Sequence, residues 1–502
     1  MNPLKKILVV GTAPDAPLTA MYLKRNRPDF DVHLHTTPST PDPAGECTTP
    51  FVLEQITGPL GIRNTDLYAI GKANWTLGFK MNWGAREQYV RAFDFAPTRQ
   101  IDGAETFSGV LAAEEGLDDA SSGASLISAG KIFPKTRANS VSLMEQITGL
   151  QLKTEPFTDL LMKGCQTVGI TQTKGAIAGI EAHDGHISSI KLENGTGLTA
   201  DLYLDVTGSA AELLSAVGSN ERMAEGSEAL CNRAWTTARH RRSEALRPYA
   251  SLDTVDSGWM WRTEHDDTIG FGLAFHSDFT SEEEAHADLL EKVREPIGKP
   301  VLHQWHNGHQ AKPWSGNVVA IGDAASFIEP LTATRLPLLI LQLQCFLRVI
   351  GEVPGGPGDR GKALYHRMIH EPWQEVRDFT SIHHRLNTVC DSPYWNHARE
   401  HCGTGVHESL LQLFRSSGPN PVFENALPFA PSALGFDTWL TALIGLGVPV
   451  RNLPAIPQED RKKWRAHLEE MRKTASHGAT AATCMEAIRK QTKQPATRAR
   501  SY

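Results

Sequence analysis

Three short apolar runs, each followed by a glycine or an acidic residue, are the most informative hydrophobic pattern along the chain. They lie at residues 7–10, 200–208 and 318–321, and the first and third precede Gly11 and Gly322-Asp323. Continuous β-branched runs of this length are typical of parallel strands buried on both faces. Turns at their carboxyl ends lead toward helices, and open α/β sheets bind cofactors at such turns. The pattern predicts an α/β fold with a Rossmann-type sheet built from distant parts of the chain.

The apolar pattern changes character between and after these runs. Residues 141–165 are predicted as a helix, and residues 166–207 as a meander with turns at Asp184-Gly185 and Asn194-Gly195. Residues 259–263 and 269–279 are predicted to form antiparallel strands. Helices are expected at residues 336–349 and 362–386, separated by a glycine- and proline-rich loop at residues 353–358. A charged helix is expected after Pro457, followed by a disordered basic tail from Gln491 onward.

Bulk composition excludes several classes of function for this chain of 502 residues. The formal net charge of −7 is small, so neither a nucleic-acid surface nor a polyanionic function is indicated. The seven cysteines lack the paired short spacings of a zinc site and are typical of a reducing compartment. Neither a signal peptide nor an apolar run long enough for a membrane span is recognised. We therefore expect a cytoplasmic protein without a nucleic-acid or membrane partner.

Five short motifs follow one another along the chain: Gly45-Glu46-Cys47-Thr48-Thr49-Pro50, Gly78-Phe79-Lys80-Met81-Asn82-Trp83, Gly258-Trp259-Met260-Trp261, His276-Ser277-Asp278-Phe279-Thr280 and Phe327-Ile328-Glu329-Pro330-Leu331. In this order they resemble the flavin-dependent tryptophan halogenases, over residues 5–454. The resemblance implies a glutathione-reductase-like FAD-binding domain, an inserted antiparallel-sheet substrate domain and a helical C-terminal part. It implies FAD that is reduced by a separate flavin reductase, chloride or bromide, and a small aromatic substrate, and it admits a homodimer.

The resemblance also implies a domain organisation. Residues 1–220 would form the first part of an FAD-binding-like domain, with a loop or lid at residues 95–140. Residues 221–312 would form the substrate-domain sheet, and residues 313–350 the returning strand and helix of the FAD domain. A helical C-terminal part would occupy residues 351–456, and the charged helix and tail residues 457–502.

Site residues are carried over from the family motif by motif. Lys80 would be the lysine between flavin and substrate, although a lysine on such a segment is more often solvated. Trp259 and Trp261 would line the tunnel between the two sites, although such pairs are often core residues. Thr332 stands at the position of the family glutamate, and Thr334 and Arg335 stand in the halide-binding turn. The expected cofactor-binding residues are Gly11, Ala13, Gly45, Glu46, Thr48, Gly322, Asp323, Pro330 and Leu331.

The first cofactor loop departs from the dinucleotide-binding pattern. A G-x-G-x-x-G fingerprint would place glycine where Gly11, Ala13 and Ala16 stand. Pro14 removes an amide donor, and Asp15 adds a carboxylate where phosphate would lie, so we expect Asp15 to act as a helix N-cap that replaces the anion. The second strand ends at Thr36 rather than at an acidic residue for the ribose. Weakened or lost FAD binding is the resulting expectation.

The turn after Pro330 departs from the family pattern Pro-Leu-Glu-Ser-Thr-Gly. The hydroxyl of Thr332 does not titrate near neutral pH and cannot act as a base, and Arg335 fills the space that a glycine leaves. Arg335 is nevertheless able to attract an anion such as a substrate carboxylate. His366/His370 and His383/His384 are interpreted as solvated helix histidines, so no metal site is expected.

Two classes of function stay open on the sequence alone. The first is FADH2- and oxygen-dependent halogenation, or a related oxidation, of an aromatic small molecule. The second is a catalytically inactive protein of the same fold that binds a ligand or a partner. The substituted positions Thr332 and Arg335 decide between the two, and the colour of the purified protein is the simplest observation that bears on them.

Overall fold

The computed structural model describes residues 5–86, 88–96, 116–135, 141, 147–351, 357–429, 432–453 and 455–493. Its central sheet has the order β20-β21-β12-β1-β2-β8. The strands are β20 (Trp314–Ser315), β21 (Val318–Ala320), β12 (Leu202–Val206), β1 (Lys6–Gly11), β2 (Asp31–Thr36) and β8 (Thr171–Lys174). β21, β12, β1, β2 and β8 pair in parallel, and β20 is antiparallel to β21. The three apolar runs thus become three adjacent strands, as predicted.

A second, seven-stranded sheet has the order β18-β14-β17-β16-β15-β5-β6. Its strands are β18 (Val301–Gln304), β14 (Arg233–His240), β17 (Thr268–Phe275), β16 (Gly258–Glu264), β15 (Ala250–Val255), β5 (Gly78–Asn82) and β6 (Tyr89–Ala92). The pairing of β16 with β17 is antiparallel, as predicted, whereas β15 pairs with β5 in parallel. The sequence did not predict that β5 and β6, from the N-terminal segment, extend this sheet. Helix α8 (Glu282–Val293) packs on it through Ala285, Leu289 and Val293.

One predicted helix is wrong in part. Residues 149–152 form strand β7 (Gly149–Leu152), and helix α6 (Thr154–Thr167) begins only after it; residues 142–146 lie outside the described part of the chain. β7 is the middle strand between β3 (Glu46–Cys47) and β4 (Asn74–Thr76), so pairing on both edges overrides the local helical pattern. The predicted meander is confirmed by β9 (Ile177–His183), β10 (His186–Leu192) and β11 (Gly197–Leu198).

Helices α9 (Arg335–Gly351) and α10 (Asp359–Arg385) confirm the two helices predicted in the C-terminal half. A small sheet of β13 (Arg222–Met223), β19 (Gly308–Gln310) and β22 (Ser326–Phe327) lies against α10, since Trp373 Nε1 donates to the Phe327 carbonyl at 3.0 Å. The other helices are α1 (Asp15–Asn26), α2 (Pro50–Thr57), α3 (Asn64–Ala69), α5 (Ser122–Ser128), α7 (Glu212–Ala216), α11 (Pro393–His401), α12 (Glu408–Ser417), α13 (Phe436–Gly445), α14 (Gln458–Ser476) and α15 (Ala481–Lys493).

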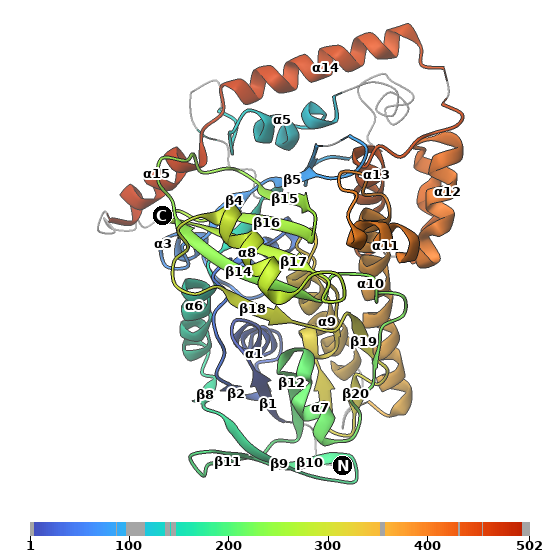
Figure 1. Cartoon of the computed structure of the whole chain (residues 1–502). Helices are drawn as coiled ribbons and strands as arrows, with labels where there is room; N and C mark the ends of the chain where they lie inside the picture. Colours follow the sequence, from blue (N-terminus) through green and yellow to red (C-terminus); the bar gives the residue numbers. More distant parts are fainter. Residues whose placement is uncertain are drawn as a thin grey trace.

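Figure 1 shows the seven-stranded sheet in the middle of the molecule, between α14 and α5 at one end and the β9–β10 hairpin at the other. The charged helix expected after Pro457 is α14. The prediction of a tail from Gln491 onward is wrong for residues 491–493, which belong to α15. Residues 494–502 lie outside the described part of the chain. So do residues 97–115 and 136–140 of the expected lid and residues 352–356 of the expected loop. Over the described residues, no helix is both long and apolar enough to cross a membrane.

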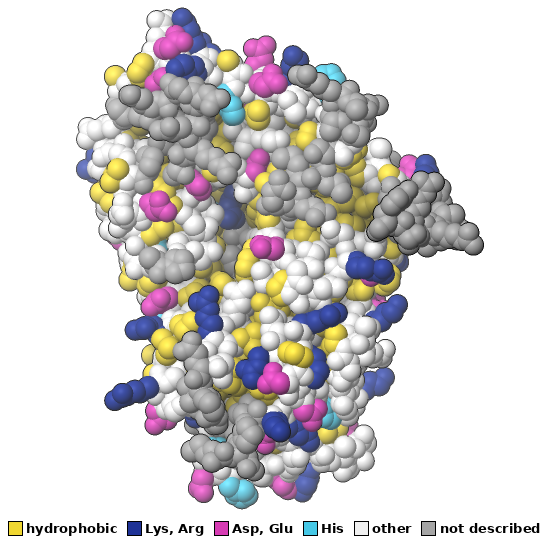
Figure 2. Space-filling model, turned by 180° about the vertical axis from the view of Figure 1, so that it is seen from behind, with side chains coloured by type: hydrophobic (Ala, Val, Ile, Leu, Met, Phe, Trp, Pro, Cys, Tyr) yellow, Lys and Arg dark blue, Asp and Glu magenta, His cyan; other side chains and the backbone are white. Residues whose placement is uncertain are grey.

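The surface carries charges of both signs. On the face drawn in Figure 2, lysine and arginine side chains alternate with aspartate and glutamate side chains rather than gathering into one field. This mixture agrees with the small net charge of −7.

Candidate functional site

A cavity of about 330 Å³ lies at the carboxyl ends of β1 and β12, against the face of β16. Its wall includes the β1–α1 loop, the strand β3, the residues after β12 and the turn that leads into α9. This volume is near the lower end of the range for small-molecule pockets. The position is the one at which open α/β sheets bind their ligands.

The structure brings many of the expected site residues to this cavity. Five of the expected cofactor-binding residues line it, together with Thr332 and three of the expected halide and tunnel residues. The lining residues are Ala13, Gly45, Glu46, Asp323, Pro330, Thr332, Arg335, Trp259 and Trp261.

Other expected residues serve the framework instead. Gly11 packs against the backbone of Val206, where an added Cβ would lie 2.0 Å from the carbonyl oxygen. The Thr48 hydroxyl accepts a hydrogen bond from the Leu150 amide at 2.9 Å and so supports β7. Gly322, Leu331 and Thr334 are buried and are not part of the cavity wall.

The guanidinium of Arg335 joins three carboxylates across the cavity. Its Nη1 lies 2.5 Å from Asp15 Oδ2 and 3.9 Å from Asp323 Oδ2. Its Nη2 and Nε lie 2.5 and 3.2 Å from the two carboxylate oxygens of Glu46, which is a bidentate pair. All four side chains are less than a quarter exposed. We call Arg335, Asp15, Glu46 and Asp323 the Arg335 cluster.

Burial dominates the titration of the cluster. It raises the pKa of Glu46 to about 7 and that of Asp323 to about 6, although Arg335 pulls both downward. Burial by itself lowers the pKa of Arg335, but the charges of Asp15, Glu46 and Asp323 outweigh it and hold that pKa well above its ordinary value. The guanidinium therefore stays charged, and its partners are carboxylates of the protein itself.

Two predictions about this region are wrong. Asp15 is not the N-cap of α1: Pro14 occupies that position without a side-chain cap, and Asp15 is the first helical residue with its carboxylate on Arg335. Arg335 is not available for a substrate carboxylate, since three protein carboxylates already surround it.

The β1–α1 loop does not fit the pyrophosphate of FAD. Pro14 offers no N–H, and the Arg335 cluster has more carboxylates than guanidinium groups. Two unit charges of like sign at about 5 Å repel by about 3 kcal/mol at an effective dielectric of 20. A bound diphosphate would therefore be repelled where a helix N-terminus normally attracts it.

The turn into α9 contains two consecutive strained residues. Thr332 has φ +68° and Ala333 has φ +61°, a region that a β-branched residue rarely adopts. The hydroxyl of Thr332 is also buried without a hydrogen-bond partner among the described residues. Strain at a cavity wall is typical of a site under functional constraint.

Replacing Thr332 by glycine is expected to stabilise the protein by about 1 kcal/mol, because glycine adopts this φ without strain and removes the unpaired hydroxyl. Urea unfolding of Thr332→Gly beside the natural protein measures the change. Thr334→Gly is the matched control: Thr334 lies in the same turn and also buries an unpaired hydroxyl, but its φ is not positive. A loss of stability in both variants would contradict the assignment of strain to Thr332.

Lys80 is not brought to the cavity. Side chains alternate along a strand, and on β5 it is the neighbouring Phe79 that lines the cavity. Burial raises the pKa values of Asp118 and Asp253, and the positive charge of Lys80 near them opposes both shifts. The expected catalytic role of Lys80 therefore has no support from the geometry.

Trp259 and Trp261 form an aromatic wall of the cavity. Both lie on the cavity side of β16, with ring centroids 5.2 Å apart, and Phe79 and Phe327 line the same space. Trp259 is 1% exposed, and its Nε1 has no hydrogen-bond partner among the described residues. An unpaired indole N–H beside aromatic rings suits a flat ligand with a hydrogen-bond acceptor.

The helix histidines are less solvated than predicted. His383 and His384 are fully buried: His383 Nδ1 lies 2.7 Å from the Phe379 carbonyl, and His384 contacts Glu329 and, at 2.9 Å, the Tyr394 hydroxyl. His366 and His370 are half-buried and face His309. These histidines are buried because one face of α10 packs inside the protein. The spacing of histidines along a helix does not show from the sequence which face is buried.

Sequence reasoning missed the pairing of Asp15 with Arg335. The two residues are 320 positions apart, and the local sequence around each does not indicate the other as a partner. One signal could have indicated this pair: the family motifs place both Asp15 and Arg335, which carry opposite charges, beside the same cofactor.

The chain has relatives among characterised proteins. A family model described as tryptophan halogenase matches residues 6–459. The tryptophan 7-halogenase KtzQ of Kutzneria sp. (strain 744) is 28% identical over 241 residues, which is 47% of this chain and 44% of KtzQ. The aligned segment thus spans less than half the length of this curated relative.

Solved structures match over nearly the whole chain. MibH, a lanthipeptide-class tryptophan 5-halogenase by its description, has a TM-score of 0.86 at 25% identity, covering 97% of this chain and 93% of MibH. BrvH, a flavin-dependent halogenase from Brevundimonas sp. BAL3, has a TM-score of 0.84 at 20% identity, covering 97% of this chain and 99% of BrvH. The predicted α/β fold is confirmed. The family implies FAD, a halide and an aromatic substrate, and the chain belongs to the tryptophan halogenase family.

Proposed function

We propose that this protein is a family member that has lost halogenation and uses the cavity to bind a small aromatic molecule. The observation that carries the proposal is the Arg335 cluster, which occupies the space between the β1–α1 loop and the turn before α9. The cluster is internally paired and buried, so opening it would leave charges without partners. The carboxylates of the Arg335 cluster take the place of bound anions, so the cluster is not itself an anion-binding site.

Loss of halogenation follows from three positions together. Thr332 lacks an ionisable group, Arg335 fills the turn expected to hold halide, and Lys80 does not line the cavity. Each of these three features removes a different requirement of the reaction, so restoring one of them leaves the others unmet.

The ligand class follows from the rest of the wall. Trp259, Trp261 and Phe79 supply aromatic surface, while Asp15, Glu46 and Asp323 leave the polar end negative in balance. A neutral or cationic aromatic molecule satisfies both ends, because rings stack on tryptophan and carboxylates attract a cation. An anionic ligand would meet the repulsion that excludes pyrophosphate.

Weak flavin binding is the expected result when FAD is titrated into the purified protein by calorimetry. Changing Ala13→Gly, Pro14→Gly and Asp15→Asn together is expected to tighten binding, because it restores an amide donor and removes one of three carboxylates while Arg335 stays in place; removing a repulsion of about 3 kcal/mol corresponds to about 100-fold tighter binding at most. Adding Arg335→Gly to these three changes is expected to reverse this gain, because Glu46 and Asp323 then face the diphosphate without a cation.

Far-ultraviolet circular dichroism of the quadruple variant serves as the control for folding. Tight FAD binding by the natural protein, or a yellow protein after purification, would overturn the proposal that the cluster replaces the cofactor's phosphates.

A further inference from the structure

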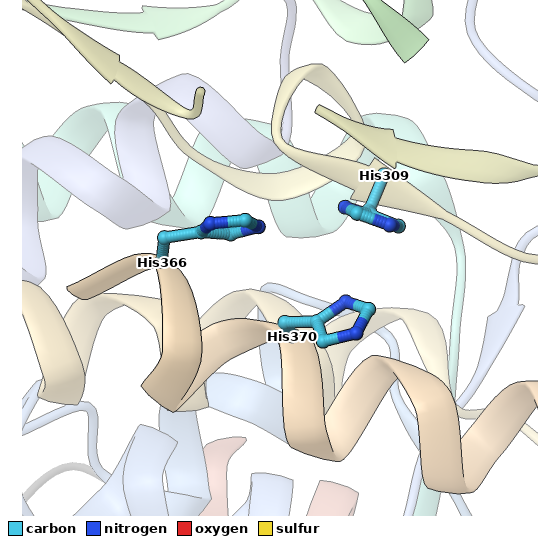
Figure 3. Close-up of side chains that lie close together, drawn as sticks. All are labelled: His309, His366 and His370. Atoms are coloured by element: carbon cyan, nitrogen blue, oxygen red, sulfur yellow. The ribbon is translucent and has the colours of Figure 1, made fainter. Parts of the chain in front are cut away.

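Three histidines from two distant segments, strand β19 and helix α10, lie close together. His366 and His370 lie one turn apart on α10, and His309 lies on β19 and faces them (Figure 3). One side-chain nitrogen from each of the three lies within 4.8 Å of those of the others. Among the described residues, this is the one group of histidine, cysteine or carboxylate side chains with metal-ligand spacing.

A carboxylate completes the group. Glu225 Oε1 lies 3.0 Å from His309 Nε2, and Glu225 Oε2 lies 3.6 Å from His370 Nε2. Glu225 adopts φ +47°, and its carbonyl accepts a hydrogen bond from Arg377, whose guanidinium also pairs with Asp378. The backbone that carries the carboxylate is thus held toward the histidines, and the charge of Arg377 is balanced locally.

The ring nitrogens are left available for a ligand bond. His309 Nδ1 lies 3.2 Å from the Gln310 carbonyl and donates to it, which leaves Nε2 directed at the group. His366 Nε2 and His370 Nδ1 are buried and have no hydrogen-bond partner in the described structure. A histidine whose one N–H donates to a carbonyl while its other nitrogen is free has the arrangement of a metal ligand.

We propose that His309, His366, His370 and Glu225 bind a divalent transition-metal ion, with Zn²⁺ the best match. Three imidazoles and one carboxylate are the ligand types that Zn²⁺ takes in tetrahedral sites, whereas Ca²⁺ and Mg²⁺ prefer oxygen ligands throughout. Tetrahedral bonds of about 2.0–2.1 Å place ligand atoms about 3.3 Å apart. The histidine rings therefore need only small rotations to close on the ion.

An ion can reach this site from solvent. The side chains of His370 and Glu225 are 22% and 35% exposed, while His309 is buried behind them. Trp373 packs against His309 and His370, with ring centroids 4.8 and 5.8 Å away, and closes the inner side.

The site would join α10 to the sheet behind the cavity wall. β19 pairs with β22, whose Phe327 lines the cavity, and Trp373 of α10 donates to the Phe327 carbonyl. Four protein ligands leave no open position for a substrate, which is the mark of a structural rather than a catalytic metal site. The ion is therefore expected to stabilise the fold without being needed for ligand binding in the cavity.

The test uses untagged, full-length protein freed of metal by chelation and dialysis. Calorimetric titration with Zn²⁺ is expected to give one equivalent bound, and bound Zn²⁺ is expected to raise the midpoint of thermal unfolding. Co²⁺ in place of Zn²⁺ is expected to give the strong visible absorption of tetrahedral coordination, a readout that needs no variant.

Variants locate the site. His309→Ala and His366→Ala are each expected to weaken Zn²⁺ binding by more than about 100-fold, and Glu225→Gln by about 10- to 100-fold. The matched control is the double change His397→Ala with His401→Ala on α11, which removes another pair at the same helical spacing, with ring centroids 4.0 Å apart. Circular dichroism of each metal-free variant checks that it folds.

Absence of stoichiometric Zn²⁺ binding by the natural protein would overturn the proposal. So would equal loss of binding in the control pair, or a weak octahedral Co²⁺ spectrum. None of these readouts involves flavin or halogenation, so the result is independent of the function proposed for the cavity.

Discussion

No chlorinated or brominated product is expected from the natural protein when a flavin reductase, NADH, FAD, oxygen and halide are supplied with tryptophan, indole, pyrrole or phenol. Loss of one positioned acid or base typically costs ~10²–10⁴-fold in rate. Here Thr332 replaces the acidic residue, and Arg335 occupies the halide turn with its charge already paired. The combined loss places any turnover below detection.

Mass spectrometry for the halogen isotope pattern is the measurement, with a competent tryptophan halogenase as the positive control. The double change Thr332→Glu with Arg335→Gly is expected to recover little, because it leaves Asp15, Glu46 and Asp323 without a cation beside the cofactor loop. Adding Asp15→Asn to it is the more favourable starting point. A clear isotope pattern from the natural protein would refute the proposed loss of halogenation.

Much of the fold was predictable because its strongest signals are local. Continuous apolar runs predicted β1, β12 and β21, and turn dipeptides predicted the β9–β10–β11 meander. The failures involve long-range pairing: β7 forms between β3 and β4, and β5 joins β15 across some 170 residues. No local pattern specifies such a partner.

The site was predictable only as a location. The motifs placed Glu46, Trp259, Thr332 and Arg335 near one another, and the structure brings them to one cavity. The side of the sheet on which each side chain lies was not predicted. Side chains alternate along β5, and it is Phe79 rather than the neighbouring Lys80 that lines the cavity.

The histidine group shows the same limit. His366 and His370 were visible as a helical pair, but His309 and Glu225 lie more than 50 and 140 residues away in sequence. Judging the pair without its tertiary neighbours favoured solvated side chains. A ligand set contributed by separate segments becomes visible only when the sheets and helices are assembled.

Replacing Arg335 by alanine is expected to destabilise the protein by about 3–5 kcal/mol at pH 8, the range for a buried charge that loses its partner. The loss should be smaller at pH 5.5. In the natural protein the pKa values of Glu46 and Asp323 are about 7 and about 6, above the ordinary values of about 4 in an unfolded chain. Removing the guanidinium raises both further, so at pH 5.5 these two carboxyls are protonated and less negative charge loses its partner than at pH 8.

The sign follows from proton binding. Between about pH 4 and 7 Glu46 and Asp323 hold more protons in the folded state than in the unfolded state, so their contribution to stability falls as pH rises through this window, and it falls further in Arg335→Ala. Urea unfolding at pH 5.5 and pH 8 measures the difference. Arg242→Ala is the control, because Arg242 and its partner Glu295 are 67% and 70% exposed and such a surface pair contributes about 1 kcal/mol or less. Equal losses for Arg335→Ala at the two pH values would mean that the three carboxylates do not depend on this guanidinium, and the Arg335 cluster would then not be the feature that excludes anions from the cavity.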